Sequence, residues 1–252
     1  MHDKVLSKVA RITLLFWLMK VVATTLGETL GDFISMTLNL GYSVGIAITF
    51  VFFILVLVTQ LRTKHYIPYV YWLVIVGTTT LGTEISDWID RTLHLGYIAG
   101  SIVLVVLLIA ALFIWFKKFG DLKVYPILTP GKELYYWIAI LFSNSLGTAF
   151  GDYLTDNLEL SYMHGALITG GIILCVAALH YLTRINDVLL FWIAFVFTRP
   201  FGATFGDFLT KPVSKGGLNL GTLASSLVAI AILTLFIILE HQQEDKRRKA
   251  TT

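Results

Sequence analysis

The sequence predicts an all-α membrane protein with eight transmembrane helices, arranged as four parallel two-helix repeats that are pseudo-symmetric about the membrane normal. Composition is the first observation behind this prediction. Of the 252 residues, 56% are hydrophobic and only 14% are charged, and the mean hydropathy is +0.78, whereas soluble domains carry about 25% charged residues. The second observation is a polar stretch ending in Asp that returns four times, because similarity at a regular period is typical of repeat proteins.

Each copy of the polar stretch follows a Trp at a constant distance of 15 residues. The four pairs are Trp17–Asp32, Trp72–Asp87, Trp137–Asp152 and Trp192–Asp207. A Leu-x-Leu element after each Asp opens a second helix, so the unit is a two-helix hairpin. We predict a single transmembrane domain, 1–252, with repeats 12–61, 67–117, 132–182 and 187–240. A linker around residues 117–135 divides the sequence into halves 1–120 and 130–252. Repeat four departs from the pattern, because Pro200 enters its polar stretch and five extra residues precede Leu218.

The apolar runs are each about 20 residues long, which is enough to cross a bilayer as a helix. They predict helices near 12–35, 40–60, 67–90, 96–116, 134–156, 161–181, 188–210 and 218–240. Fourteen loop and terminal Lys and Arg residues fall on the side that holds both termini, from Lys4 to Lys249, against Arg91, Lys211 and Lys215 on the other. The positive-inside rule therefore places both termini in the cytoplasm, for a protein of the inner (plasma) membrane.

Polar side chains recur on one face of each odd-numbered helix, at positions three, four, seven and eight before the Asp. We expect the odd helices to converge on this stripe and the apolar even helices to face lipid, because polar faces turn away from hydrocarbon. Gly pairs at 27/31, 147/151 and 202/206 would let these helices approach closely. The candidate cation-binding residues are Thr25, Glu28, Asp32, Thr80, Glu84, Asp87, Asn144, Ser145, Asp152 and Asp207.

The charges within the predicted spans indicate a cation site. Six carboxylates face only two bases, Lys20 and Arg199, which we assign as charge-balancing groups. Oxygen ligands suit hard cations, so a metal would bind at Glu28, Asp32, Glu84 and Asp87. Protonation of some carboxylates would release it. No Cys-based or zinc site is expected, because the single Cys175 lies far from the stripe and no His lies on it.

Structural interpretations compete with these roles. Each Asp lies near a helix end and could fix the hairpin turn by hydrogen bonding. Arg199 could be a counter-ion for Asp207, and Lys20 could extend to the membrane interface. The repeated Trp residues are interpreted as interfacial anchors or packing groups.

The four Trp–Asp repeats resemble a family of bacterial multi-pass membrane proteins built from four tandem two-helix repeats of unknown function, and the resemblance covers Trp17 to about residue 240. It implies no activity, so function rests on the residues. They favour a secondary transporter of a small cation, with a divalent metal such as Mn²⁺ or Mg²⁺ preferred and protons as the coupling ion. The alternatives are a cation channel with a carboxylate-lined pore and a non-transporting membrane scaffold. No nucleophile–base pair or ATP-binding motif indicates an enzyme, and no cofactor or nucleic acid is expected. The partners are the cation and the lipid bilayer, and a homo-oligomer is left open.

Overall fold

The computed structural model describes residues 7–249, and within this range the chain forms α-helices, short π-helical turns and one 3-10 turn, with no strand. The α-helices are α1 (Leu14–Asp32), α2 (Tyr42–Arg62), α3 (Pro68–Asp87), α4 (Gly96–Phe119), α5 (Pro130–Asp152), α6 (Tyr162–Leu182), α7 (Asp187–Thr210) and α8 (Thr222–Lys249). The π-helical turns η1 (Phe33–Thr37), η2 (Trp88–Thr92) and η3 (Tyr153–Asn157) continue α1, α3 and α5, and η4 (Val213–Lys215) is the 3-10 turn. The bounds follow the prediction closely, except that α8 continues well past residue 240. The ends of the predicted domain, including Lys4 of the orientation count, lie outside the described residues.

Six helices in the described range are long and apolar enough to cross a membrane. They comprise α1 with η1, α2, α4, α6, α7 and α8. The composition of α3 and α5 is more polar, because α3 carries the Thr-rich stretch 78–83 and α5 begins with charged residues. The chain is therefore a helical protein with the composition of a multi-pass membrane protein.

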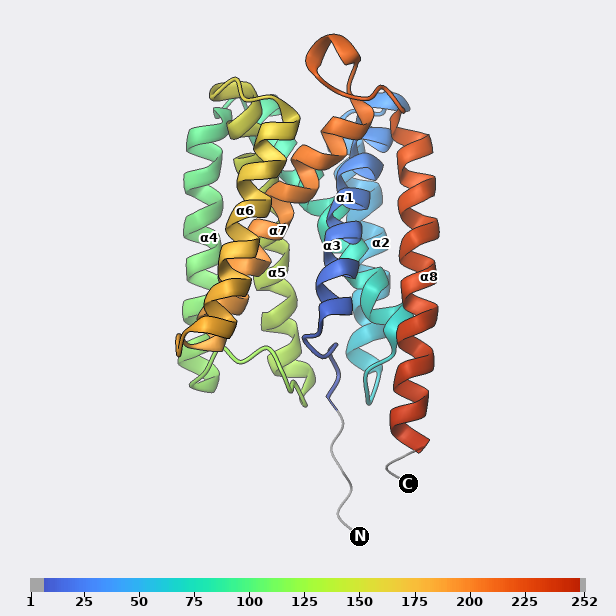
Figure 1. The fold of residues 1–252 in the computed structure, drawn as a ribbon, viewed down its shortest axis with the longest axis vertical. Coiled ribbons are helices and arrows are strands. Elements are labelled where there is room, and N and C mark those ends of the chain that lie inside the picture. The colour runs from blue at the N-terminus through green and yellow to red at the C-terminus, as the bar shows by residue number, and fades with distance from the viewer. Residues whose placement is uncertain (1–6, 250–252) are drawn as a thin grey trace.

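The odd helices form the centre of the molecule, and the even helices surround them (Figure 1). In sequence order, α1 packs against α3, α3 against α5, α5 against α7, and α7 returns to α1, which closes a ring. The even helices α2, α4 and α6 pack mainly on α3, α5 and α7, and α8 packs on α1. Each outer helix thus covers the inner helix of the next repeat rather than that of its own. The outer helices expose apolar side chains such as Leu55, Ile109 and Leu174, which confirms the predicted division into polar inner and apolar outer helices.

Glycines bring the inner helices together at equivalent points around the ring. A Cβ added at any of these glycines would come within 3.0 Å of the facing helix, so only glycine allows the observed approach. The contacts pair Gly27 with Thr79, Gly82 with Asn144 and Ser145, Gly147 with Arg199, and Gly202 with Thr24. The linker between the sequence halves does not interrupt the ring, because the contact of α3 with α5 resembles the other three.

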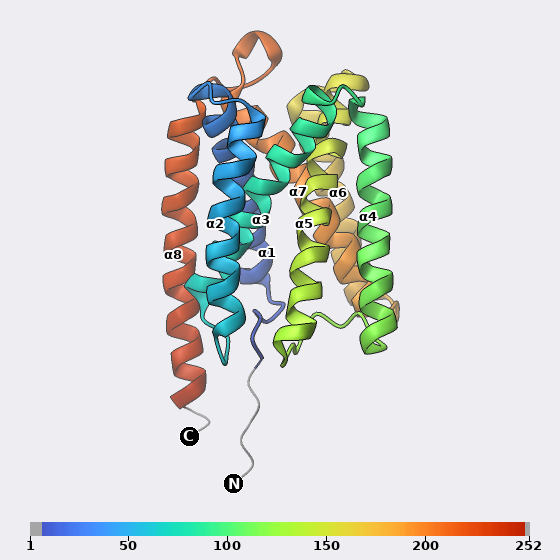
Figure 2. The same ribbon diagram turned by 180° about the vertical axis from the view of Figure 1, so that it is seen from behind.

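Two ends of the ring can be distinguished (Figure 2). We call the end where α1 begins and α8 ends the terminal end, and the opposite end the hairpin end. At the hairpin end one residue in each connection, namely Asn39, His94, Glu159 or Asn219, adopts a φ of 53 to 56°. This left-handed conformation is one that Asn tolerates better than most side chains. All four connections therefore turn in the same way, which gives the four repeats one orientation.

Aromatic side chains fill the ring at the terminal end. Trp72 and Trp137 are fully buried, and Trp192 is 7% exposed. Tyr71 and Tyr136 join them through a hydrogen bond of 2.5 Å between their hydroxyl groups. The repeated Trp residues are therefore packing groups inside the bundle, and of the two predicted interpretations the interfacial anchor is wrong for these three.

Candidate functional site

The axis of the ring is lined by residues spaced four apart on each inner helix, because side chains at that spacing share a helix face. Counting back from each Asp, the layers lie at positions zero, four, eight and twelve. The layer at eight contains Thr24, Thr79, Asn144 and Arg199, and the layer at four contains Glu28, Thr83, Thr148 and Ala203. The axis is therefore acidic near the hairpin end, and basic side chains extend into it from the side of the terminal end.

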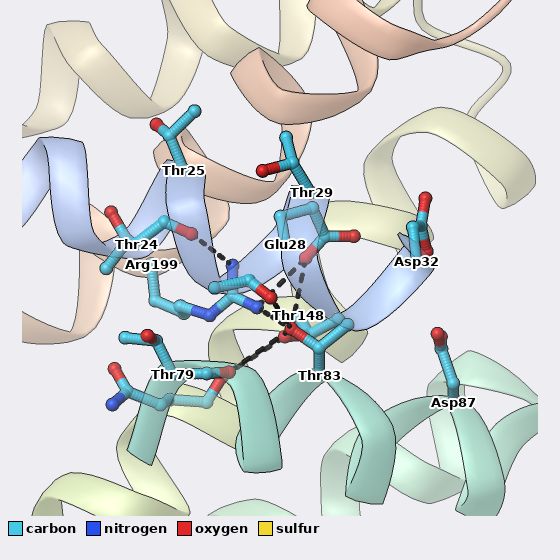
Figure 3. A network of polar contacts seen from close by, with 12 residues as sticks. Thr24, Thr25, Glu28, Thr29, Asp32, Thr79, Thr83, Asp87, Thr148 and Arg199 are labelled. Carbon is cyan, nitrogen blue, oxygen red and sulfur yellow. Dashed lines mark hydrogen bonds and ion pairs between the residues drawn. The ribbon is translucent and has the colours of Figure 1, made fainter. Parts of the chain in front are cut away.

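Arg199 extends from α7 into the centre of the ring and is fully buried. Its Nη2 donates hydrogen bonds to Glu28 Oε2 at 2.9 Å and to the hydroxyl of Thr83, and its Nη1 donates to the Thr24 carbonyl at 3.4 Å (Figure 3). The prediction that Arg199 is the counter-ion of Asp207 is wrong. Arg199 lies eight residues before Asp207, and its side chain extends across the axis to α1 rather than along its own helix.

Lys20 is also fully buried on the axis. Its Nζ donates to Asn144 Oδ1 at 2.9 Å and lies 4.1 Å from the centroid of the Phe195 ring. Asn144 in turn donates to the hydroxyl of Thr78 at 3.0 Å. The prediction that Lys20 extends to the membrane interface is wrong, because an amide acceptor and an aromatic face across the ring stabilise the ammonium where it lies.

The four repeated Asp residues form a ring at the hairpin end, which we call the carboxylate ring. Arg91 lies 3.4 Å from Asp87 and 3.2 Å from Asp152. Lys211 lies 2.6 Å from Asp32 and 3.1 Å from Asp207. The ion-pair partners of these carboxylates are therefore side chains of repeats two and four, rather than backbone amides of the hairpin turns. Arg91 and Lys211 also correct the charge count, because six acids now face four bases.

Three carboxylates converge on one side of this ring, and we call them the carboxylate trio: Glu28, Asp32 and Asp207. One oxygen from each lies within 4.8 Å of the others, and all three residues are buried. Lys211 contacts two of them from just beyond α7. Burial lowers the pKa of Lys211, but Asp207 and Asp32 outweigh it and raise the pKa above its ordinary value. Lys211 is therefore an ammonium group at neutral pH.

The structure brings together only two of the four metal ligands predicted from the sequence, because Glu28 and Asp32 belong to the carboxylate trio and Glu84 and Asp87 do not. Glu84 is fully buried but faces α2, where a Cβ at Gly45 would meet its carboxylate. Neither of its oxygens accepts a hydrogen bond within the described part of the chain. Glu84 lies three residues before Asp87, so its side chain points to the neighbouring helix rather than to the axis. Asp87 pairs with Arg91. Asp207, rather than Glu84 or Asp87, completes the cluster with Glu28 and Asp32.

The predicted hydroxyl ligands are turned toward their own helices. Thr25 donates to the Val21 carbonyl at 3.1 Å and Ser145 to the Leu141 carbonyl at 3.1 Å, and Thr25 points away from Arg199 (Figure 3). Thr80 is buried, and its hydroxyl has no hydrogen-bond partner in the range that the structure describes. Three residues that the predicted site did not include make the contacts instead: Thr83, Arg91 and Lys211. Arg91 and Lys211 share a detectable signal, since each lies four residues after the Asp of its repeat.

The fold and the site define a helical protein of multi-pass membrane composition whose polar axis holds paired acids and bases. Comparison with known sequences agrees with its repeat structure. The chain belongs to the family described as Repeat of Unknown Function (DUF347), whose model matches it four times in tandem, at residues 15–66, 70–118, 135–186 and 190–245. The resemblance to a family of four tandem repeats is thereby confirmed. Neither the curated proteins nor the solved structures that were searched gave a match.

Proposed function

We propose that the protein is a secondary transporter of a small cation and that the carboxylate trio binds this substrate. The observation that carries the proposal is the convergence of three buried carboxylates from two helices within 4.8 Å. Carboxylate oxygens at this separation suit a hard divalent cation such as Mn²⁺ or Mg²⁺. Protons compete for the same oxygens, so exchange of the metal for protons is the coupling that we propose.

The transport proposal includes a topology in which all eight helices cross the membrane and both termini are cytoplasmic. The polar residues of α3 and α5 lie inside the ring, so their lower hydropathy does not expose polar groups to lipid. At the hairpin end Arg91 and Lys211 are held in ion pairs, which leaves Lys215 as the exposed loop base. Exposed bases at the terminal end include Lys117, Lys118 and Lys123, and the positive-inside rule assigns that end to the cytoplasm.

Site-directed labelling tests this topology. Cys175 is exposed and would be replaced by Ser first. In intact cells a membrane-impermeant thiol reagent should label a Cys at position 215 and spare one at position 123. The reverse pattern would contradict the orientation.

Calorimetric titration with Mn²⁺, Mg²⁺ and Ca²⁺ tests the site. The wild type should bind at least one of these cations, more weakly at about pH 6 than at about pH 8. Asp32→Asn should weaken binding by about tenfold or more, about 1.4 kcal/mol, because it removes a charge-assisted contact. The matched control is Asp156→Asn, which removes an exposed acid at the same end and should change affinity by less than about twofold. If the wild type binds none of the cations the metal proposal fails, and equal binding by Asp32→Asn places the site elsewhere.

A cation channel is the second candidate, favoured by the four Asp residues arranged around one pseudo-fourfold axis, since rings of acidic side chains select cations. Arg199 and Lys20 lie on that axis between the carboxylate ring and the terminal end, so ions could pass only if both side chains moved. Flux measured in proteoliposomes distinguishes the candidates. A transporter gives saturable flux coupled to a pH gradient, a channel gives conductance without such coupling, and absence of any flux favours the scaffold.

A further inference from the structure

Lys211 occupies the position where a bound cation would meet the carboxylate trio. Its side chain is 21% exposed, whereas those of Asp32 and Asp207 are 4% and 8% exposed. The lysine therefore covers the two carboxylates on their solvent side. Asp207 Oδ1 is buried and accepts no hydrogen bond in the described structure, and it meets Lys211 as an ion pair at 3.1 Å. This oxygen has unused capacity to bind a cation.

The equivalent base of repeat two has a different setting. Arg91 belongs to the helical turn η2, and its guanidinium contacts Asp87, Asp152 and the hydroxyl of Tyr42, to which it donates at 3.2 Å. Lys211 follows the end of α7 and begins the connection that contains the five extra residues. A guanidinium holds several acceptors in a planar arrangement, while an ammonium is a compact point charge on a flexible stem. The arginine thus acts as a crosslink, and the lysine resembles a small cation.

Resting on the transporter function proposed above, we propose that Lys211 is an internal competitor for the cation site, and that a divalent cation binds by displacing its ammonium group from Asp32 and Asp207. Charge balance supports a divalent substrate. When all three of its carboxylates are ionised, the trio carries three negative charges, which its ion-pair partners Arg199 and Lys211 reduce to one. A divalent cation in place of the ammonium makes the cluster neutral, whereas a monovalent cation leaves the buried net charge unchanged.

The test measures Mn²⁺ affinity of the purified protein and three variants by calorimetry. Lys211→Met removes the competing charge at similar side-chain length and should tighten binding by about tenfold or more. Lys211→Arg offers the two carboxylates a stronger partner and should weaken binding. Lys215→Met is the matched control, because it removes an exposed charge from the same connection and should change affinity by less than about twofold.

The opposite directions of the two Lys211 variants keep the test decisive, since a folding defect would weaken binding in both. If the wild type binds Mn²⁺ and Lys211→Met binds no more tightly than Lys215→Met, Lys211 is not a competitor and the transporter proposal stands. If all four proteins fail to bind Mn²⁺, Mg²⁺ and Ca²⁺, the cation site itself is wrong and the competitor falls with it.

Discussion

Buried ion pairs lie at both ends of the four-helix ring, but in opposite surroundings. At the terminal end Lys8 and Glu133 meet at 2.5 Å with side chains only 2% and 0% exposed, and Gln60 donates to the same carboxylate at 2.6 Å. At the hairpin end the bases Arg91 and Lys211 are 33% and 21% exposed. An enclosed pair can separate only if the surrounding structure opens, whereas a partly exposed pair can exchange partners. We therefore expect the ion pair at the terminal end to contribute more to stability than the ion pairs at the hairpin end.

Loss of Glu133 should have the largest effect on stability. Glu133→Ala leaves Lys8 buried without its anion and removes acceptors for Gln60 and Trp137. We expect the free energy of unfolding in detergent to fall by about 3–5 kcal/mol. The double variant Lys8→Met/Glu133→Leu should recover most of this loss, because it removes the unpaired charge. A loss below about 1 kcal/mol in the single variant would show that the enclosed pair at the terminal end does not contribute strongly to stability.

A methyl group at a ring contact should have the next largest effect. Gly202→Ala places a Cβ against Thr24 of the neighbouring inner helix, and overpacking of this kind costs about 1–3 kcal/mol. Gly171→Ala is the control, because α6 offers open space at that position and Ala favours the helix. Thermal unfolding of both variants would show whether the ring contacts or helix propensity decide the outcome.

At the hairpin end, removal of one carboxylate should be milder than the change at Glu133. Asp152→Asn leaves Arg91 its second partner, Asp87, so we expect a loss of about 1–2 kcal/mol. Chemical denaturation in detergent would measure it beside Glu133→Ala. An equal or larger loss for Asp152→Asn would show that the hairpin end is as rigid as the terminal end.

The smallest effect should come from the partly exposed pair of Asp121 and Lys132, which are 2.6 Å apart at the terminal end and whose side chains are 38% and 14% exposed. Burial raises the pKa of Asp121, but hydrogen bonds from Lys132 and from the backbone of Lys123 outweigh it and hold the pKa below its ordinary value. The pair therefore stabilises the fold above the unfolded pKa of about 3.9, and this contribution disappears as pH falls through the lower folded value. Lys132→Met should cost less than about 1 kcal/mol at neutral pH, and this cost should vanish once the pH is well below the lowered pKa of Asp121. A difference that grows toward acid would contradict the assignment.

The sequence predicted the repeat, the helices and the division into inner and outer layers, because each depends on periodicity along one helix. Asp32, Asp87, Asp152 and Asp207 were found for the same reason, since an acid inside an apolar helix is rare and these four recur at one position of the repeat. The polar stretch did not show which positions face the axis. Positions three and four before the Asp differ by one residue, yet Glu84 faces α2 while Glu28 faces Arg199.

The ion pairs between different helices could not be predicted, because they depend on distances between those helices. The prediction counted Arg91, Lys211 and Lys8 as loop or terminal charges, yet each pairs with a carboxylate from a distant part of the sequence. Long side chains of Arg and Lys reach partners across the ring, and sequence spacing carries no information on that reach. The axis layer at four also includes Thr83, whose role appears only when α1, α3 and α7 are placed together.

The packing of α8 against α1 determines when the molecule can be completed during synthesis. Ser226 of α8 donates to the hydroxyl of Thr29 on α1 at 2.9 Å, across 197 residues of chain. The other inner helices meet their covering helix at once, because α2, α4 and α6 precede α3, α5 and α7. Of the four inner helices, α1 is therefore made first and covered last. At about 5–20 residues per second the ribosome needs roughly 10–40 s to make that stretch, and throughout this time the hydroxyl of Thr29 lacks its partner on α8.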